Sequence, residues 1–271
     1  MRYGYRWPQH YRGARPTIAE SRTRALIAYR PKLSYDEDMA LEVVAFTHLA
    51  QVARQFQREV STLSLGYPDL LVSEEVLASV GVSLETVAVA TDQEAIARWH
   101  GWPGIIYETT AVLRQLAISP TYVDIRASRG IERIVDLNER IDAALQYDIV
   151  LDPGTLEHCF NIGLAFSNVL RLTKVGGYIL HVNPCTMVNH GFYNLSPTAY
   201  KDFYEQNGAK IIKLYGLAGS GQERKMANLD PVARTTLPAE TSLLVIVQKE
   251  IECEPVWPTQ TKYLQHSSLK S

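Results

Sequence analysis

The sequence predicts an α/β fold in which a mostly parallel β-sheet is covered by helices on both faces. Strand-like and helix-like segments alternate along most of the chain, and this alternation is typical of parallel sheets with helical crossovers. The last two strand-like segments, 210–217 and 242–250, are joined by a loop without a helical pattern. We therefore expect an antiparallel hairpin at one edge of the sheet.

Length, charge and cysteine count limit the classes of protein to which the chain can belong. The chain has 271 residues, of which 46% are hydrophobic and 21% charged, and its formal net charge is -2. This length suits one large α/β domain with additions, and the charge gives no sign of a nucleic-acid partner. Three scattered cysteines without CxxC spacing argue against a disulfide scaffold and a structural zinc site. Without a long apolar run or a secretory signal, we expect a cytoplasmic protein with no membrane partner.

The individual elements follow from periodicity and from end signals. Apolar residues at helical spacing predict a helix at Asp36–Arg58, with acidic residues early and arginine late, as the helix dipole favours. Residues 67–71 are expected to form a loop. Further helices are expected at 73–81, 94–101, 107–117, 162–177 and 196–208, and strands at 61–66, 121–125, 132–137, 147–152 and 178–184, besides the final pair.

Small and acidic residues stand at the ends of the predicted strands. Gly66 would let a ligand approach the backbone closely, and Asp124 would offer paired acceptors to two vicinal ribose hydroxyls. Asp136 could accept from an exocyclic amine, although a Gly or Asp at a strand end is more often a plain turn residue. No GxGxxG or GxxxxGK[ST] loop is present, which favours a nucleoside-containing cofactor without phosphates.

Residues 61–250 carry, in this order, the motifs STLSLG, YVDI, ERIVDLN, YDIVLDPGTLEH and LRLTKVGGYILHVNP. These motifs resemble those of class I S-adenosylmethionine-dependent methyltransferases. GTLEH together with HGFYNLSP is more specific and resembles a little-characterised bacterial group. The resemblance implies a Rossmann-like, seven-stranded sheet and S-adenosylmethionine as cofactor. With the arm and helix expected at 1–59 and a polar, proline-containing tail expected at 252–271, the methyltransferase domain would span 60–251.

The resemblance also assigns cofactor contacts. They are expected from Gly66, Asp69, Asp124, Asp136, Leu137, Asp152 and Gly154. The first motif has one glycine where the family usually has a GxGxG-like loop, so Asp69 would help to shape the methionine pocket. Gly66 and Asp124 are 58 positions apart, which makes residues 82–118 an insertion or a lid. Alternatively, residues 87–92 are the second strand and Asp92 takes the ribose; we favour Asp124.

The clusters GTLEH and HGFYN are the candidates for the chemistry. His190, His158 and Glu157 are expected to be catalytic, because imidazole is suited to removing a proton from an acceptor hydroxyl. Alternatively, Glu157 caps a helix and His158 packs in a loop. Acceptor contacts are expected from Phe192, Tyr193 and Asn194. His181, inside a predicted strand, fits a buried or supporting position better.

No metal site is expected, because 32 positions separate His158 from His190 and no ligand pair has helical i, i+4 spacing. The favoured function is O-methylation of a small molecule or a glycan, with histidine-assisted deprotonation. The alternatives are a catalytically inactive S-adenosylmethionine-binding regulatory protein, or an NAD- or nucleotide-sugar-dependent enzyme on a similar sheet. Aromatic residues near the start would stack on a sugar or pack against a second copy in a homodimer.

Overall fold

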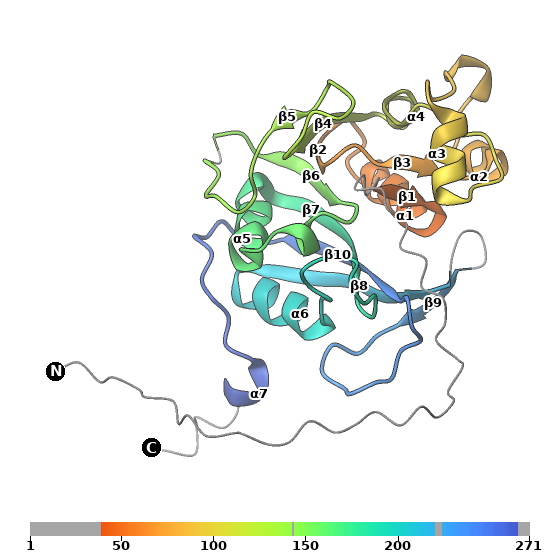
Figure 1. Ribbon diagram of the computed structural model, residues 1–271. Helices are drawn as coiled ribbons and strands as arrows, with labels where there is room; N and C mark the ends of the chain where they lie inside the picture. The colour runs from red at the N-terminus through yellow and green to blue at the C-terminus, as the bar shows by residue number, and fades with distance from the viewer. Residues whose placement is uncertain (1–38, 143, 220–223, 265–271) are drawn as a thin grey trace, which may run out of the picture. The chain divides into compact units, whose positions relative to one another are not determined.

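The computed structural model describes residues 39–142, 144–219 and 224–264 (Figure 1). The expected N-terminal arm and the end of the expected tail lie outside these residues. Within them, no helix is both long and apolar enough to cross a membrane.

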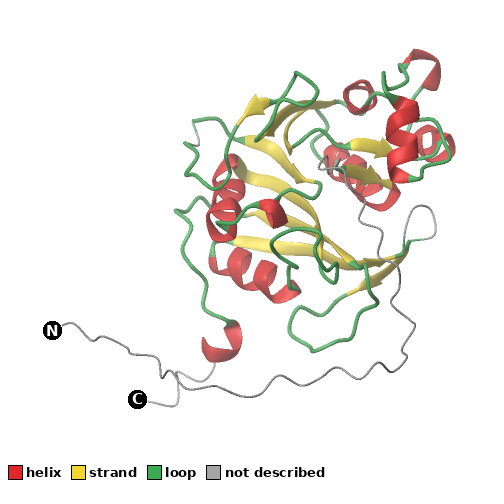
Figure 2. Ribbon diagram, viewed as in Figure 1, coloured by secondary structure: helices red, strands yellow, loops and turns green. Residues whose placement is uncertain are grey.

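The central sheet has eight strands rather than the seven expected. In spatial order they are β5 (Arg133–Ile134), β4 (Ile118–Asp124), β2 (Val60–Leu65), β6 (Tyr147–Asp152), β7 (Thr173–Pro184), β10 (Ser242–Lys249), β8 (Ala209–Ala218) and β9 (Lys225–Asn228). The first five are mutually parallel, whereas β10, β8 and β9 pair antiparallel (Figure 2). The Rossmann-like α/β fold with its C-terminal antiparallel hairpin is therefore confirmed, and the extra strand, β9, forms within the segment expected to be a loop.

Helices cover both faces of the sheet. Their bounds are α1 (Val43–Arg54), α2 (Glu74–Ser79), α3 (Gln93–His100), α4 (Thr109–Gln115), α5 (Ile162–Leu172), α6 (Pro197–Gln206) and α7 (Thr261–Leu264), with 3-10 turns η1 (Leu84–Thr86) and η2 (Leu156–His158). Strand β10 shows how both faces are filled. Leu244 and Ile246 join the core beneath α1 and α4, and Val245 and Val247 join the core beneath α5 and α6.

The N-terminal part departs from expectation at two places. Residues 40–42 form strand β1 (Ala40–Glu42) rather than the start of a helix, and residues 69–71 form strand β3 (Asp69–Leu71) rather than a loop. The two strands pair in parallel, and the N–H of Asp69 donates to the carbonyl of Met39 at 2.7 Å. This long-range pairing overrides the local helical pattern.

The strand that was expected to end near Asp124 is present as β4. β4 pairs with β2 along its length and ends at Asp124, whereas residues 87–92 form only one isolated bridge, between Val89 and Tyr107. Asp92 instead precedes α3. Within the segment 82–118, Ile96, Trp102 and Ile106 pack on Leu71 of β3 in a small separate cluster. Other buried residues of the segment, Val82, Val87, Tyr107, Val112, Leu113 and Ile118, join the core beneath α1 and α4.

Two helices end clearly earlier than expected, and the first is α1, which ends at Arg54 rather than Arg58. The helix expected at 162–177 ends at Leu172, and strand β7 begins at Thr173, which pairs with Tyr147 of β6. Gly177 cannot carry a side chain there, since a Cβ would lie 2.8 Å from the carbonyl oxygen of Asp148. Gly177 therefore allows close strand contact rather than ending a helix, and Gly176, beside it, has φ of +80°.

Candidate functional site

The parallel strands end at one edge of the sheet, and the predicted site residues gather there. β4, β2, β6 and β7 are consecutive neighbours in the sheet, and their carboxyl ends point the same way (Figure 1). Open α/β sheets bind their ligands at this edge. The edge has two halves, one at the ends of β2 and β4 and one at the ends of β6 and β7.

Gly66 and Asp124 lie against each other at the first half. Gly66 has φ of +89°, and its N–H donates to the carbonyl of Val123 at 2.6 Å. A Cβ added to Gly66 would lie 3.3 Å from Oδ2 of Asp124 and would overlap the side chain of Met39. Arg126 donates its N–H to Oδ1 of Asp124 at 3.0 Å, and burial raises the pKa of this carboxyl. Only glycine fits beside this carboxylate.

Met39 and Thr155 close the space around Gly66. The Thr155 hydroxyl lies 2.6 Å from the carbonyl of Leu65 and 2.9 Å from the sulfur of Met39. No sequence pattern marks Met39, because it lies far from Gly66 along the chain and meets it only through the pairing of β1 with β3. A thioether therefore lies next to the glycine that the sequence assigned to the cofactor.

Asp69 is buried with both carboxylate oxygens engaged. Oδ1 pairs with Arg129 at 2.7 Å, and Oδ2 pairs with Nε2 of His100 at 3.2 Å. The Arg129 guanidinium also lies over the ring of Tyr67, 5.2 Å from its centroid. Asp69 thus links α3 to the loop that follows β4, and neither basic partner was predicted. Its expected part in the cofactor pocket stays a prediction, and these contacts favour shaping of the pocket over direct contact.

Asp136 and Leu137 lie in the loop after β5. Oδ1 of Asp136 accepts from the backbone N–H of Asn138 at 2.8 Å and from its side-chain amide at 2.9 Å. Leu137 is buried in the core beneath α5 and α6. Asp136 therefore stabilises its own turn, and its contact with a cofactor remains a prediction.

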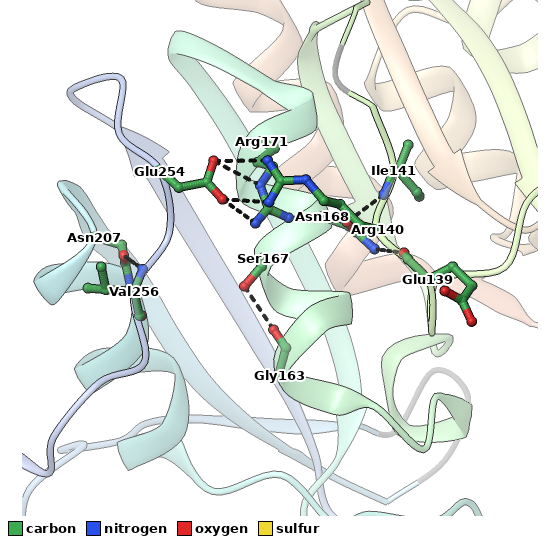
Figure 3. Close-up of polar contacts among 10 residues, drawn as sticks. All are labelled: Glu139, Arg140, Ile141, Gly163, Ser167, Asn168, Arg171, Asn207, Glu254 and Val256. Atoms are coloured by element: carbon green, nitrogen blue, oxygen red, sulfur yellow. Dashed lines mark hydrogen bonds and ion pairs between the residues drawn. The ribbon is translucent and has the colours of Figure 1, made fainter.

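A buried asparagine fixes this loop from below. Asn168 of α5 donates to the carbonyl of Leu137 at 3.1 Å. It also donates to the carbonyl of Glu139 at 2.8 Å and accepts from the N–H of Ile141 at 3.1 Å (Figure 3). Both side-chain N–H groups of Asn168 and its side-chain oxygen are thus paired with backbone groups. The sequence showed Asn168 only as a polar residue inside an apolar helix, which is a signal for such a bond.

The second half of the edge rests on a buried polar network. Oδ1 of Asp152 accepts from the N–H of Thr155 at 2.9 Å, while Oδ2 lies 2.8 Å from Nδ2 of Asn183 and 2.7 Å from Nδ1 of His181. Since a carboxylate only accepts, Nδ1 of His181 donates, and Nε2 accepts from the hydroxyl of Tyr204 at 2.6 Å. Asp152, Asn183, His181 and Tyr204 are all buried, so His181 occupies the supporting position favoured by the sequence.

The same network holds Glu157. The Asn183 amide donates to Oε2 of Glu157 at 2.9 Å, and its Oδ1 accepts from the hydroxyl of Tyr200 at 2.5 Å. Glu157 has no exposed surface, and its other oxygen, Oε1, has no hydrogen-bond partner among the described residues. Asn161, and not Glu157, precedes α5, so the capping alternative is not what the structure shows. The sequence analysis did not select Asn183 or Tyr200 as site residues. Asn183 could have been found, because it is a polar residue near the end of a buried strand.

Both predicted histidines lie near Oε1 of Glu157, the oxygen that has no hydrogen bond among the described residues. Nε2 of His190 is 3.5 Å and Nε2 of His158 is 4.0 Å from Oε1 of Glu157. The two rings are 5.5 Å apart between centroids, and the side chains are 42% and 32% exposed, respectively. The fold thus unites GTLEH and HGFYN around one buried carboxylate.

Two glycines lie beside Glu157, and one of them, Gly191, allows a close approach of the two loops. Gly191 packs on Glu157 so tightly that a Cβ would lie 2.9 Å from its carbonyl oxygen, and Phe192 donates its N–H to that oxygen at 2.9 Å. Gly154 has φ of +110°, and a Cβ there would lie 3.5 Å from Oε1 of Glu157. Gly154 therefore borders the candidate chemistry, and its assignment to the cofactor remains a prediction.

The predicted acceptor residues extend from the same loop. Phe192 is 65% exposed and meets Phe160 edge-on, with ring centroids 5.4 Å apart. The Tyr193 hydroxyl donates to the carbonyl of Phe160 at 2.9 Å, while Asn194 accepts from the N–H of Met187 at 2.7 Å. Phe160 and Phe192 offer an exposed aromatic surface, which can stack on a ring, and Asn194 holds its own loop.

Comparisons with known proteins give a distant likeness. No family model and no curated protein matches the chain. Among solved structures, it is similar to a putative sarcosine dimethylglycine methyltransferase from Galdieria sulphuraria, at 12% identity and a TM-score of 0.38 over 64% of this chain. The match spans only 60% of that protein's length.

Two further structures give the same picture. A putative methyltransferase from Bacillus halodurans is 10% identical, with a TM-score of 0.40, over 74% of this chain and 99% of that one. The 1,6-didemethyltoxoflavin-N1-methyltransferase of Burkholderia thailandensis, which carries bound S-adenosylhomocysteine, is 13% identical with a TM-score of 0.34, over 74% and 76% of the two chains. At such identities and TM-scores, the function has to be inferred from this chain's own residues.

Proposed function

We propose that the chain is an S-adenosylmethionine-dependent methyltransferase that acts on an oxygen of a small molecule or a glycan. The contact between Gly66 and Asp124 is the observation that carries this proposal. Gly66 at the end of β2 has no side chain of its own, the Met39 side chain covers its backbone, and the carboxylate beside it ends the neighbouring strand. A ribose with two vicinal hydroxyls suits paired carboxylate acceptors, and it needs the close backbone approach that only glycine allows.

The same edge does not suit a cofactor with phosphates. A pyrophosphate requires a glycine-rich turn or a helix N-terminus that presents several N–H groups. After Gly66 the chain continues into Tyr67 and Pro68 and then into β3, not directly into a helix. This local structure favours a nucleoside cofactor such as S-adenosylmethionine over NAD or a nucleotide sugar.

The second half of the edge would receive the acceptor. In methyl transfer, an acceptor oxygen forms a bond to the methyl carbon as the bond from that carbon to the cofactor's sulfur breaks. The proton of the acceptor hydroxyl would pass to an imidazole nitrogen of His190 or His158. Glu157, held by Asn183, would stabilise the positive charge that the imidazole gains. Phe160 and Phe192 would stack on the acceptor.

One observation favours a second function, that of a binding protein without turnover. The Met39 side chain fills the space that a Cβ on Gly66 would enter, so it would have to move for a cofactor to approach this backbone. A regulatory protein could use such a contact to respond to S-adenosylmethionine. Tight binding of S-adenosylhomocysteine with no methyl transfer to any acceptor would favour this alternative.

A calorimetric titration with S-adenosylhomocysteine tests the cofactor. We expect micromolar binding, and no binding of NAD or a nucleotide sugar under the same conditions. A folded protein that binds NAD and not S-adenosylhomocysteine would contradict the proposal. Acceptor screening with labelled S-adenosylmethionine would then distinguish an enzyme from a binding protein.

A further inference from the structure

A cluster of metal-ligating side chains lies at the second half of the edge. Glu157, His158 and His190 each offer one ligand atom, and these three atoms all lie within 4.8 Å of one another. The distance along the chain between the two histidines argued against a metal in the sequence. In the fold that argument no longer holds, because the loops after β6 and β7 bring the histidines together.

The buried carboxylate is the strongest part of this cluster. Oε1 of Glu157 is fully buried and accepts no hydrogen bond from the described residues. A buried acceptor without a hydrogen bond is unfavourable, and more so when it is charged, because its lost hydration is not replaced. The imidazole nitrogens nearest to it, at 3.5 and 4.0 Å, are too far away for good hydrogen bonds. A cation between the three atoms would satisfy the oxygen.

The distances leave room for such an ion. Ligand atoms that share one tetrahedral metal at about 2.1 Å lie about 3.4 Å apart. The separation between Glu157 and His190, 3.5 Å, already fits, and the separation between Glu157 and His158, 4.0 Å, is longer. Since both histidines are partly exposed and Glu157 is fixed in the core, binding would draw the imidazoles toward the carboxylate.

Supporting hydrogen bonds complete the arrangement. Metal-ligating carboxylates are usually held by a hydrogen bond to their other oxygen, and Asn183 donates to Oε2 of Glu157 at 2.9 Å. Asn183 is in turn held by Tyr200, whose hydroxyl donates to its Oδ1. One oxygen of Glu157 is thus anchored, and the other is directed at the two histidines.

We infer that Glu157, His158 and His190 bind one divalent transition-metal ion of the zinc type. Two imidazoles and one carboxylate match the ligands of zinc and its neighbours in the first transition row. Mg²⁺ and Ca²⁺ prefer sites made of oxygen ligands, of which this cluster has few. Three protein ligands and the exposed side of the histidines leave a coordination position open to water or to a substrate oxygen.

Metal binding by these side chains does not depend on the proposed cofactor, but it would refine the proposed reaction. An acceptor hydroxyl bound at the open position would lose its proton more readily, because a divalent cation stabilises the oxyanion. His158 and His190 would then hold the ion, and the proton would go to water. The acceptor would accordingly be an oxygen nucleophile able to reach the ion, as an alcohol or a phenol is.

Calorimetric titration of the chelator-treated full chain with Zn²⁺ tests the site, with Mg²⁺ as a second titrant. We expect one Zn²⁺ bound per chain at this site, and Mg²⁺ at least about a hundredfold more weakly. Titration with Co²⁺ should give a visible absorption band. Glu157→Gln keeps the shape of the side chain, and His190→Ala changes a partly exposed one. Each should weaken Zn²⁺ binding about tenfold or more.

Glu205→Gln is the matched control, because Glu205 is an exposed residue of α6 that pairs with Lys201. It should bind Zn²⁺ as the unchanged protein does, and thermal unfolding should show that all variants are folded. Zn²⁺ binding that is absent, or unaffected by both Glu157→Gln and His190→Ala, would overturn the inference. Titration with S-adenosylhomocysteine in the same samples tests the cofactor separately, so failure of one proposal does not imply failure of the other.

Discussion

The two halves of the candidate ligand-binding edge differ in the groups that line them. At the ends of β2 and β4, the backbone of Gly66, the partly exposed carboxylate of Asp124 and the Met39 side chain line the space. At the ends of β6 and β7, side chains define it. There Glu157 is held by Asn183, which also binds Asp152 and Tyr200, all of them buried.

This difference determines how each half should respond to substitution. A partly exposed carboxylate can be removed with little effect on the fold, so the first half should lose ligand affinity and keep its stability. In the buried network, removing one member leaves several polar atoms without partners, and their desolvation is not recovered. The second half should therefore lose stability and chemistry together, except at the exposed histidines.

His190→Ala should have the largest effect. Its imidazole lies at the carboxylate of Glu157, so the proposed deprotonation, by a free base or through a bound metal, depends on it. We expect turnover to fall about a hundredfold or more, with unchanged affinity for S-adenosylhomocysteine. Steady-state rates with an acceptor found by screening provide the measurement. Full activity in this variant would remove His190 from the chemistry.

Asn183→Ala should show that the second half contributes more to the stability of the fold than the first half does. It removes the amide that donates to both Asp152 and Glu157 and leaves the Tyr200 hydroxyl without its acceptor. We expect the free energy of unfolding in urea to fall by about 3 kcal/mol. Asp124→Ala, measured alongside, should change it by about 0.5 kcal/mol or less. Equal losses in the two variants would mean that the halves do not differ as described.

Asp124→Ala should act on affinity instead. Losing the paired acceptors for the ribose should weaken S-adenosylhomocysteine binding about ten- to a hundredfold, as expected for hydrogen bonds to a charged group. Asp92→Ala is the control, since Asp92 precedes α3 and does not end a sheet strand. Calorimetry measures both. Unchanged affinity in Asp124→Ala, or a loss in Asp92→Ala, would exclude Asp124 as the ribose ligand.

Asp148, at the opposite end of β6, allows the stability prediction to be checked at a buried carboxylate that belongs to neither half. Bonds from Arg58, at 2.8 Å, and from Lys174, at 2.9 Å, hold the pKa of its carboxyl well below the usual range. A depressed pKa in the folded state stabilises the protein above the unfolded pKa, and this contribution is lost as the pH falls below about 4. Asp148→Asn should cost about 2 kcal/mol at pH 7.

Urea unfolding of both proteins at pH 7 and near pH 3 measures this prediction. The difference between the unchanged protein and Asp148→Asn should shrink at the lower pH. A difference that grows as the pH falls would contradict the assignment of the depressed pKa. Binding of S-adenosylhomocysteine should be the same in both proteins, because Asp148 lies at the amino end of the strand.

Much of the fold was readable from local patterns. The strand expected at 147–152 agrees residue for residue with β6, because a continuous apolar run is followed by Pro153 and Gly154. The α6 helix begins after Ser196, whose hydroxyl accepts from the N–H of Thr198, as the capping pattern indicated. Where contacts distant in sequence decide the structure, as for β1 and β3 or for the start of β7, the local pattern misled.

The candidate site divides in the same way. Gly66, Asp124, Glu157 and the two histidines could be chosen because strand ends and short motifs mark them. Asn183, Tyr200 and Met39 could not be, since each takes its place only through the folded arrangement of separate elements. The expectation of no metal rested on spacing along the chain, which says little about two loops that meet in space, as those of His158 and His190 do.

A calorimetric comparison of the unchanged protein, Asp124→Ala and Glu157→Gln with S-adenosylhomocysteine tests the central claim most directly. A cofactor half that is separable from an acceptor half predicts micromolar binding in the unchanged protein. It also predicts nearly the same affinity in Glu157→Gln and binding at least about tenfold weaker in Asp124→Ala. No binding by the folded unchanged protein, or equal losses in the two variants, would contradict the account.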